Sequence, residues 1–143
     1  MAALSVYFDA SVIVPMFLPD VFNERIETYI ETEPTDVVIS DFVSAEFASV
    51  VGLRLRMGSL VMAGAREALL KFDVWVQQYA VAAETQARDV HAAQAMLRRL
   101  DLVLRTPDAI SLAIALRLGA ELATFDVRMA DCARALGMAV VAL

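Results

Sequence analysis

Apolar residues occur along this chain in short blocks, and two of these blocks end at an aspartate. Residues 4–8 (LSVYF) lead to Asp9, and residues 121–125 (ELATF) lead to Asp126. Both blocks are rich in β-branched or aromatic residues, which is typical of strands, and helical spacing of apolar residues follows each aspartate. Because a strand that passes directly into a helix opens a βαβ unit, the pattern predicts an α/β fold with a parallel sheet.

Between these two blocks the chain continues to alternate between helical and strand patterns. The remaining predicted elements are helices over Asp20–Glu33, Asp41–Met57, Leu60–Tyr79, Thr85–Leu104, Ala109–Leu118 and Val127–Leu136, and strands over Val37–Ser40, Val81–Ala83 and Met138–Leu143. We expect one domain over residues 1–143, with a four- or five-stranded parallel sheet. Right-handed crossovers then predict that the first and fourth strands are neighbours.

Several residues mark the expected ends of these helices. Asp20 is a predicted N-cap and Pro34 a stop, while Thr106 and Pro107 suit the N-cap and first position of a later helix. The helix after Asp9 contains Pro15, so it must be short or kinked.

The composition predicts a partner-covered apolar face and a location inside the cell. Apolar residues make up 59% of the chain and the mean hydropathy is +0.61, which predicts an apolar face that a partner covers. No run of 18 residues is free of charge, and the first residues lack the basic start of a signal peptide, so we expect neither a membrane span nor secretion. A single cysteine, Cys132, fits a reducing compartment, and we expect the protein to be cytoplasmic.

The net charge of −6 argues against loose electrostatic binding to nucleic acid. The basic residues, however, are eleven arginines and Lys71 alone, and arginine is the better fork for phosphate. Neutralising four acids with metal would leave a net charge of about −2. The overall charge is therefore compatible with an RNA substrate.

Four acids are placed where chemistry could use them. Asp9 and Asp126 end strands, Asp108 lies in the first turn of a helix, and Glu46 lies in an apolar helical stripe. Each acid alone could be a helix cap or a solvated side chain. If the two strands are neighbours, however, all four could meet in the crevice at the carboxyl ends of the strands.

A cluster of this kind would require a cation. Two carboxylates about 4 Å apart repel by roughly 4 kcal/mol at an effective dielectric constant of 20. Ligands that are only oxygen favour Mg²⁺ or Mn²⁺, which can activate a water against a phosphate. The sequence has no lysine near the acids, no serine–histidine pair and no glycine-rich phosphate loop, and His91 with Cys132 are too few ligands for zinc.

The acidic segments FDASVIV, SAEFASVVGLRLR, TPDAISLAIALRLG and TFDVRMADCARALGMAVV resemble, in order and spacing, the four acidic motifs of PIN-domain ribonucleases, above all VapC-type toxins. This resemblance implies a three-layer α/β/α fold with Asp9, Glu46, Asp108 and Asp126 as catalytic, metal-holding residues. Ser11 matches a hydroxyl that helps to hold the first aspartate or the metal, and Thr124 matches a frequent hydroxyl position. We expect Asp131 not to be a direct ligand.

The resemblance also implies Mg²⁺-dependent cleavage of structured RNA, a homodimer, and an antitoxin that lays a segment into a groove. A catalytically silent PIN module that binds protein or RNA is the alternative, and a DNA nuclease is a weaker one. The presence of all four acids favours the endoribonuclease, which would be the toxin of a type II toxin–antitoxin pair.

Two sets of residues are predicted to contact partners. The outer apolar face of the hairpin formed by helices 42–57 and 60–79 is expected to receive the antitoxin, although some of its residues should be core. Its candidate contacts are Met62, Leu69, Phe72, Trp75 and Tyr79. The candidate contacts for RNA phosphates or an antitoxin carboxylate are Arg54, Arg56, Arg98, Arg99 and Arg105.

Overall fold

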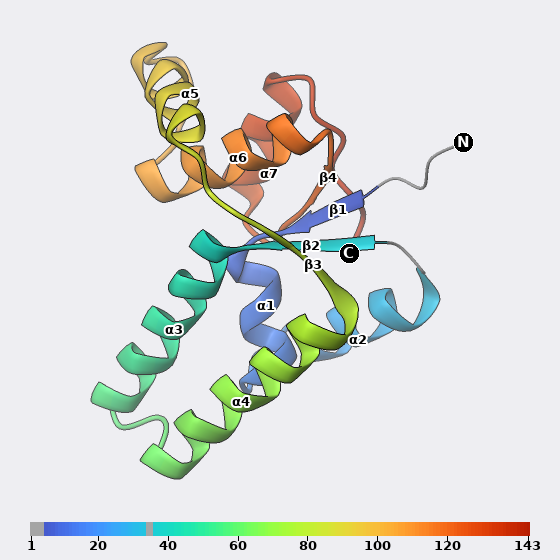
Figure 1. The fold of residues 1–143 in the computed structure, drawn as a ribbon, viewed down its shortest axis with the longest axis vertical. Coiled ribbons are helices and arrows are strands. Elements are labelled where there is room, and N and C mark those ends of the chain that lie inside the picture. Colours follow the sequence, from blue (N-terminus) through green and yellow to red (C-terminus); the bar gives the residue numbers. More distant parts are fainter. Residues whose placement is uncertain (1–4, 34–35) are drawn as a thin grey trace.

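Four parallel strands form the central sheet of the computed structural model, which describes residues 5–33 and 36–143 (Figure 1). The strands are β1 (Ser5–Phe8), β2 (Asp36–Ser40), β3 (Ala80–Ala83) and β4 (Glu121–Ala123). Their order is β3-β2-β1-β4, so the predicted neighbours β1 and β4 are adjacent. Tyr7 of β1 lies opposite Val38 of β2 and Leu122 of β4.

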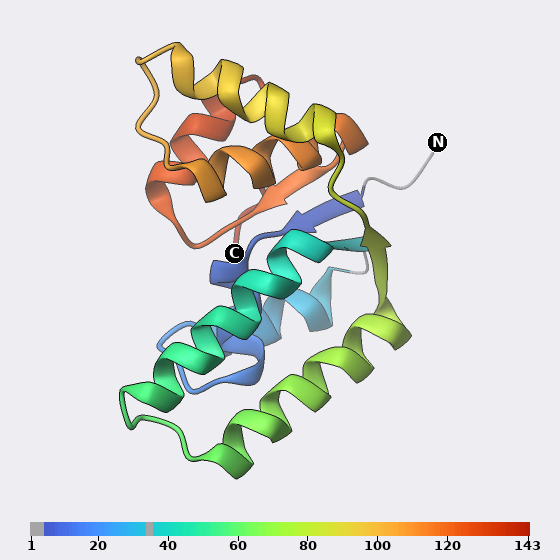
Figure 2. The ribbon, with the colours of Figure 1, turned by 60° about the vertical axis from the view of Figure 1, so that its left-hand side comes forward.

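Helices cover both faces of this sheet, which gives the predicted three-layer α/β/α architecture. Figures 1 and 2 show α5, α6 and α7 on one face and α1 to α4 on the other. The helices are α1 (Ala10–Phe17), α2 (Asn23–Thr32), α3 (Asp41–Arg56), α4 (Met62–Tyr79), α5 (Ala87–Arg98), α6 (Thr106–Leu118) and α7 (Val127–Ala135). Among the described residues, none of these helices is long and apolar enough to cross a membrane.

The strand β1 lies at the centre of the core. Val6, Tyr7 and Phe8 are completely buried, because a parallel strand with helices on both faces has no solvent side. Aromatic side chains of α1, α3 and α4 pack together on one side of the sheet, where Phe17 lies edge-on against Phe47 and Phe72, and Trp75 of α4 stacks on Phe8 of β1. This packing holds the strand that ends at Asp9.

The structure corrects the limits of two predicted helices. The helix expected from Asp20 begins at Asn23, because the Asp20 carboxylate accepts a hydrogen bond from the Phe22 N–H in a preceding turn (3.0 Å). The helix expected over Thr85–Leu104 is α5, which begins at Ala87 with a capping box formed by Gln86 at the N-cap and Asp89 in the first turn. It ends at Arg98, because Leu100 adopts a left-handed backbone with φ of 64°.

The prediction of a last strand over Met138–Leu143 is wrong. Only one parallel bridge forms there, between Leu122 and Val140, with two hydrogen bonds along the edge of β4. The sheet thus has four strands rather than five within the described part of the chain, and β4 ends at Ala123 rather than at Phe125.

Smaller corrections concern helix starts. Helix α6 begins at Thr106 with Arg105 in the N-cap position, so Thr106 is one position inside the helix rather than its cap. Helix α4 begins at Met62 rather than at Leu60. Pro15 lies inside α1, which is short as predicted, and the predicted stop at Pro34 lies outside the described residues.

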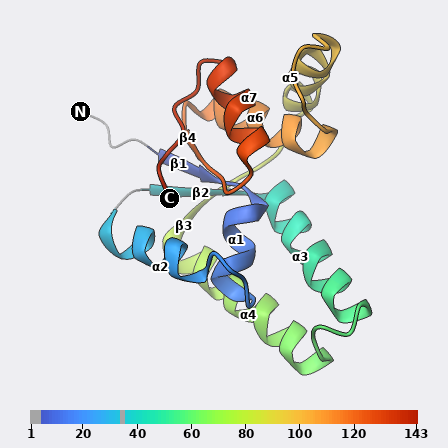
Figure 3. The ribbon, with the colours of Figure 1, turned by 180° about the vertical axis from the view of Figure 1, so that it is seen from behind.

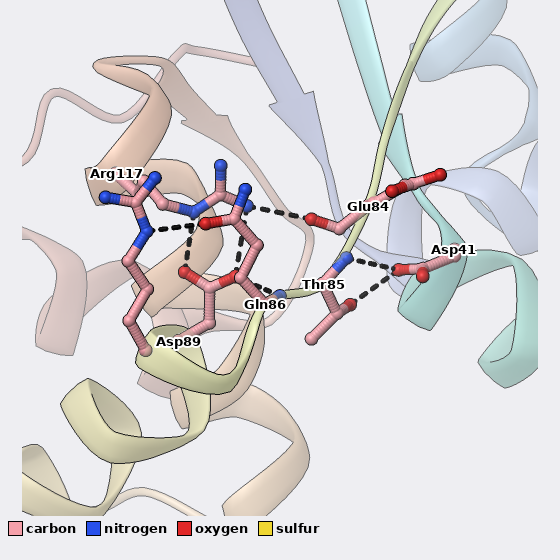
Figure 4. A network of polar contacts seen from close by, with 7 residues as sticks. Asp41, Glu84, Thr85, Gln86, Asp89 and Arg117 are labelled. Atoms are coloured by element: carbon pink, nitrogen blue, oxygen red, sulfur yellow. Dashed lines mark hydrogen bonds and ion pairs between the residues drawn. The ribbon is translucent and has the colours of Figure 1, made fainter.

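A polar network joins the segment between β3 and α5 to both helical layers (Figure 4). The Asp41 carboxylate at the start of α3 accepts hydrogen bonds from the backbone N–H and the hydroxyl of Thr85 (2.9 and 2.5 Å). The Arg117 guanidinium of α6 donates to both carboxylate oxygens of Asp89 (2.7 and 3.0 Å) and to the Glu84 carbonyl (2.9 Å). Burial raises the pKa of Asp89, but the hydrogen bonds from Arg117 outweigh it and keep that pKa below its ordinary value.

Candidate functional site

The four predicted acids all come from segments that meet at the carboxyl-end edge of the sheet. Asp9 directly follows β1, and Asp126 precedes α7 just beyond β4. Glu46 lies in the second turn of α3 and Asp108 in the first turn of α6. Helices α1 and α3 leave the sheet at this edge (Figure 3), so the adjacent strands β1 and β4 bring Asp9 and Asp126 to the same place.

Asp9 is held by the hydroxyl groups of Ser11 and Thr124. Its side chain is buried and makes no capping hydrogen bond to α1. One carboxylate oxygen accepts a hydrogen bond from the Ser11 hydroxyl (2.6 Å), and the other accepts one from the Thr124 hydroxyl (2.7 Å). The structure therefore gives both predicted accessory residues a contact with Asp9, although their part in catalysis stays a prediction.

The same hydroxyls also fix the turn that carries Asp126. The Phe125 N–H donates to Ser11 Oγ (2.9 Å), and the Asp126 N–H donates to Thr124 Oγ1 (3.0 Å). One carboxylate oxygen of Asp126 caps α7 by accepting from the N–H groups of Arg128 and Met129. Within the described residues, its other oxygen has no hydrogen bond, so capping leaves Asp126 able to bind a cation as well.

Burial and mutual repulsion perturb the acids. Burial raises the pKa of Asp9 to about 6 against the hydrogen bonds from Ser11 and Thr124, and the charge of Asp126 raises it further. Burial also raises the pKa of Glu46 to about 7, with help from the charges of Asp9 and Asp108 and against that of Arg105. Glu46 therefore lies close enough to Asp9 and Asp108 for their charges to raise its pKa.

The side chains do not form a closed ligand set as they stand. In the part of the chain that the structure describes, no three Asp, Glu, His or Cys side chains are close enough to hold a metal ion together. The donors are nevertheless those that a hard divalent cation prefers, because they are carboxylate and hydroxyl oxygens. Burial is the main cause of the raised pKa values of Asp9 and Glu46, and neighbouring carboxylates raise them further. A bound cation would offset both effects, so these residues fit a divalent metal ion.

A second polar group, which the sequence did not reveal, lies beneath the acids. The buried Tyr7 hydroxyl bonds Ser40 Oγ (2.8 Å) and donates to Ser111 Oγ (3.0 Å). Ser40 caps α3 by accepting from the Val43 N–H (3.0 Å), and Ser111 lies three residues after Asp108 on α6. These contacts join the three elements that carry Asp9, Glu46 and Asp108. The signal in the sequence was the hydroxyl of Tyr7 inside one apolar strand and that of Ser40 at the end of another.

We expect the substitution Tyr7→Phe to lower the free energy of unfolding by about 1–3 kcal/mol, because it removes the group that joins two buried serines. Urea denaturation followed by circular dichroism measures this change. Tyr79→Phe is the matched control, since Tyr79 is 68% exposed and the same atom is removed. Equal midpoints for the two variants would contradict a stabilising role of the Tyr7 hydroxyl.

The predicted partner surfaces are only partly exposed. Phe72 is buried, and the half-buried Leu69 and Trp75 pack against the core, so part of the candidate set is core, as expected. Met62 and Tyr79 are exposed as expected, and the other exposed apolar residues of this hairpin are Leu53, Met57, Val61, Leu70 and Val74. The face that could receive a partner is therefore made largely of residues that the prediction had not named.

Three of the predicted phosphate-binding arginines already have partners. Arg54 donates to the Pro19 carbonyl (2.9 Å) and pairs with Asp20 (3.5 Å), while Arg99 pairs with Asp101 (2.9 Å). Arg105 lies 3.5 Å from the Asp108 carboxylate. Because an ion pair must be broken or shared before such an arginine can bind a phosphate, these residues are weaker candidates than the sequence suggested.

Known proteins resemble this chain over nearly its whole length. Residues 6–135 match the family model of the PIN domain. The chain is 33% identical over 141 residues to Ribonuclease VapC46 of Mycobacterium tuberculosis. This alignment covers 96% of this chain and 97% of the relative. The crystal structure of M. tuberculosis VapC20, described as a sarcin–ricin loop cleaving toxin, has a TM-score of 0.76 at 19% identity and covers 96% of this chain and 99% of that one.

A toxin–antitoxin complex from Klebsiella pneumoniae includes a chain with a TM-score of 0.60 at 18% identity, covering 85% of this chain and 86% of that one. At these identities the solved structures show the fold alone. The family match and the curated relative extend over all four acids, from Asp9 to Asp126. The chain therefore belongs to the PIN domain family.

Proposed function

We propose that this protein is a divalent-metal-dependent endoribonuclease and the toxin of a type II toxin–antitoxin pair. The observation that carries this proposal is that the segments bearing Asp9, Glu46, Asp108 and Asp126 lie at one sheet edge, where burial and neighbouring carboxylates raise the pKa values of Asp9 and Glu46. A relative at 33% identity that is named a ribonuclease supports it. We further propose that residues 1–143 form one domain and that the protein is cytoplasmic and homodimeric.

In this proposal the four acids hold one or two Mg²⁺ or Mn²⁺ ions, and Ser11 and Thr124 keep the Asp9 carboxylate in place. The bound metal would lower the pKa of a water and stabilise the negative charge that develops on the phosphate. Asp126 would bind through the oxygen that does not cap α7. A bound cation would lower the pKa of Glu46, so this carboxylate would hold the metal directly or through a water, and one of the four acids would take the proton of the attacking water.

The proposed antitoxin partner would cover the exposed apolar residues of the hairpin of α3 and α4. The surplus of apolar surface and the likeness to a chain of a toxin–antitoxin complex support this assignment. The outer side of α4 offers Met62, Leu70 and Val74 at intervals of four or eight residues, which places them on one face of the helix. An amphipathic segment is the kind of partner that suits such a stripe.

Incubation of the purified protein with total RNA, followed by mapping of new RNA ends, tests the proposed activity. We expect new ends with Mg²⁺ or Mn²⁺ and none with EDTA, because the acids repel each other and the phosphate without a cation. Single-stranded and duplex DNA serve as parallel substrates. Cleavage of DNA alone would favour a DNA nuclease, and the absence of new ends with either metal would favour a silent binding module.

A further inference from the structure

A pocket of about 320 Å³ lies beside the candidate catalytic acids. It is lined by loop 102–105, by Asp108 at the start of α6, and by Asp126 and Arg128 at the start of α7. Its volume falls at the lower end of the roughly 300–1,000 Å³ that is usual for small-ligand sites. Two of the proposed metal-holding carboxylates therefore share a pocket with two guanidinium groups, those of Arg105 and Arg128.

Within the described residues, Arg128 differs from Arg99, Arg105 and Arg134 because it has no acidic partner. Arg99 pairs with Asp101, Arg105 with Asp108 and Arg134 with Asp131. The Arg128 side chain is exposed and forms no ion pair within residues 5–33 and 36–143. Its backbone N–H donates to the Asp126 carboxylate (2.9 Å), which fixes the start of this side chain next to a proposed catalytic acid.

We propose that this pocket binds the phosphate next to the scissile phosphate of an RNA strand, with the Arg128 guanidinium donating to its oxygens. The inference rests on the proposed function and adds a substrate contact to it. A planar guanidinium can donate two parallel hydrogen bonds to a phosphate. Leu102 and Val103 line the same pocket and offer apolar contact to the ribose or base of that nucleotide.

A neighbouring pocket limits how far the proposed subsite extends. It has a volume of about 290 Å³ and shares Leu102, Val103 and Arg128 with the first. The charged groups that it adds are the carboxylates of Asp101 and Asp131, each already paired with an arginine. Because this second pocket offers no unpaired cation apart from Arg128, the pair of pockets suits one phosphate rather than a track of several.

A comparison of Arg128→Gln with Arg134→Gln tests this inference. Both residues are exposed on α7 and both substitutions remove one positive charge, but Arg134 lines neither pocket. Binding of a fluorescent single-stranded RNA is titrated at several NaCl concentrations in the Asp9→Asn background, in which cleavage is not expected. We expect Arg128→Gln to weaken binding roughly tenfold and to reduce the slope of log K against log salt by about 0.7. Arg134→Gln should change neither quantity.

A third variant, Arg128→Lys, separates charge from shape. It should keep the salt slope but bind RNA more weakly than Arg128, because an ammonium group lacks the planar fork. If Arg128→Gln and Arg134→Gln have the same affinity and slope, the subsite is wrong. Melting temperatures confirm that each variant is folded.

Cleavage by the otherwise wild-type enzymes distinguishes failure of this inference from failure of the proposed function. In the active enzyme, Arg128→Gln should raise KM more than it lowers kcat. RNA cleavage with equal KM for Arg128→Gln and Arg134→Gln overturns the subsite and leaves the nuclease intact. A protein that cleaves no RNA but loses RNA affinity with Arg128→Gln overturns the nuclease and supports an RNA-binding pocket.

Discussion

The substitution Asp9→Asn is expected to lower the rate of RNA cleavage by more than about a hundredfold while leaving the protein folded. Loss of a residue that only supports a metal ligand typically costs 10–100-fold, so loss of a proposed direct ligand should cost more. Asn keeps the size of the side chain and can still accept a hydrogen bond from Ser11 or Thr124. Single-turnover cleavage of one RNA substrate, with saturating Mg²⁺, measures the effect.

The same variant should be at least as stable as the wild type at neutral pH without metal. The folded-state pKa of Asp9 is about 6, against an ordinary value of 3.8, so ionising this buried group costs the folded state about 3 kcal/mol at neutral pH. Asn carries no charge and avoids this cost, although it weakens one hydrogen bond. A variant that loses both stability and activity would indicate a structural role for Asp9.

One control variant and one further test variant accompany Asp9→Asn. Asp131→Asn removes an exposed carboxylate on α7 that pairs with Arg134, and it should leave cleavage unchanged. Asp126→Asn keeps the ability to cap α7 but loses the charge, so a proposed metal ligand should lose activity here while a pure cap should not. Wild-type rates for Asp9→Asn would disprove its catalytic assignment.

The second large effect expected is a steep dependence of metal binding on pH. A divalent cation must displace the protons of Asp9 and Glu46, whose pKa values are about 6 and about 7. Below both values, each displaced proton lowers the apparent metal affinity about tenfold per pH unit. The rise in melting temperature on adding Mg²⁺ should therefore be small near pH 5 and large near pH 8.

Without metal, the stability of the folded protein should fall as the pH rises. A carboxyl group whose folded-state pKa is raised stabilises the fold while protonated, and this stability is lost as the pH rises through the folded-state value. For Asp9 and Glu46 together, the free energy of unfolding in EDTA should fall between about pH 4 and about pH 7. Differential scanning fluorimetry with Mg²⁺ or EDTA, at matched ionic strength, measures both trends. An equal Mg²⁺ effect at both ends of this range would contradict the coupling of the acids to a cation.

Much of the fold followed from local patterns in the sequence. The strand that ends at Asp9, the second strand after residue 36 and the amphipathic helices depend on the order of apolar residues, which acts through neighbours in the chain. The adjacency of β1 and β4 followed from the handedness of crossovers, which the twist of every strand imposes. The placement at one edge of the segments that carry the four acids followed for the same reason.

Contacts between distant residues decided the rest. Tyr7 bonds Ser40 and Ser111, which lie 33 and 104 residues away, and no local pattern encodes such a partner. The segment after Gly137 was apolar enough for a strand but forms a single bridge to β4, because pairing depends on its position at the sheet edge. The raised pKa of Glu46 likewise depends on its burial beside Asp9 and Asp108. The sequence by itself thus determined the elements and the kinds of side chain at the site, whereas the tertiary structure decided their partners and protonation, because hydrogen bonding and desolvation depend on atoms brought together only by folding.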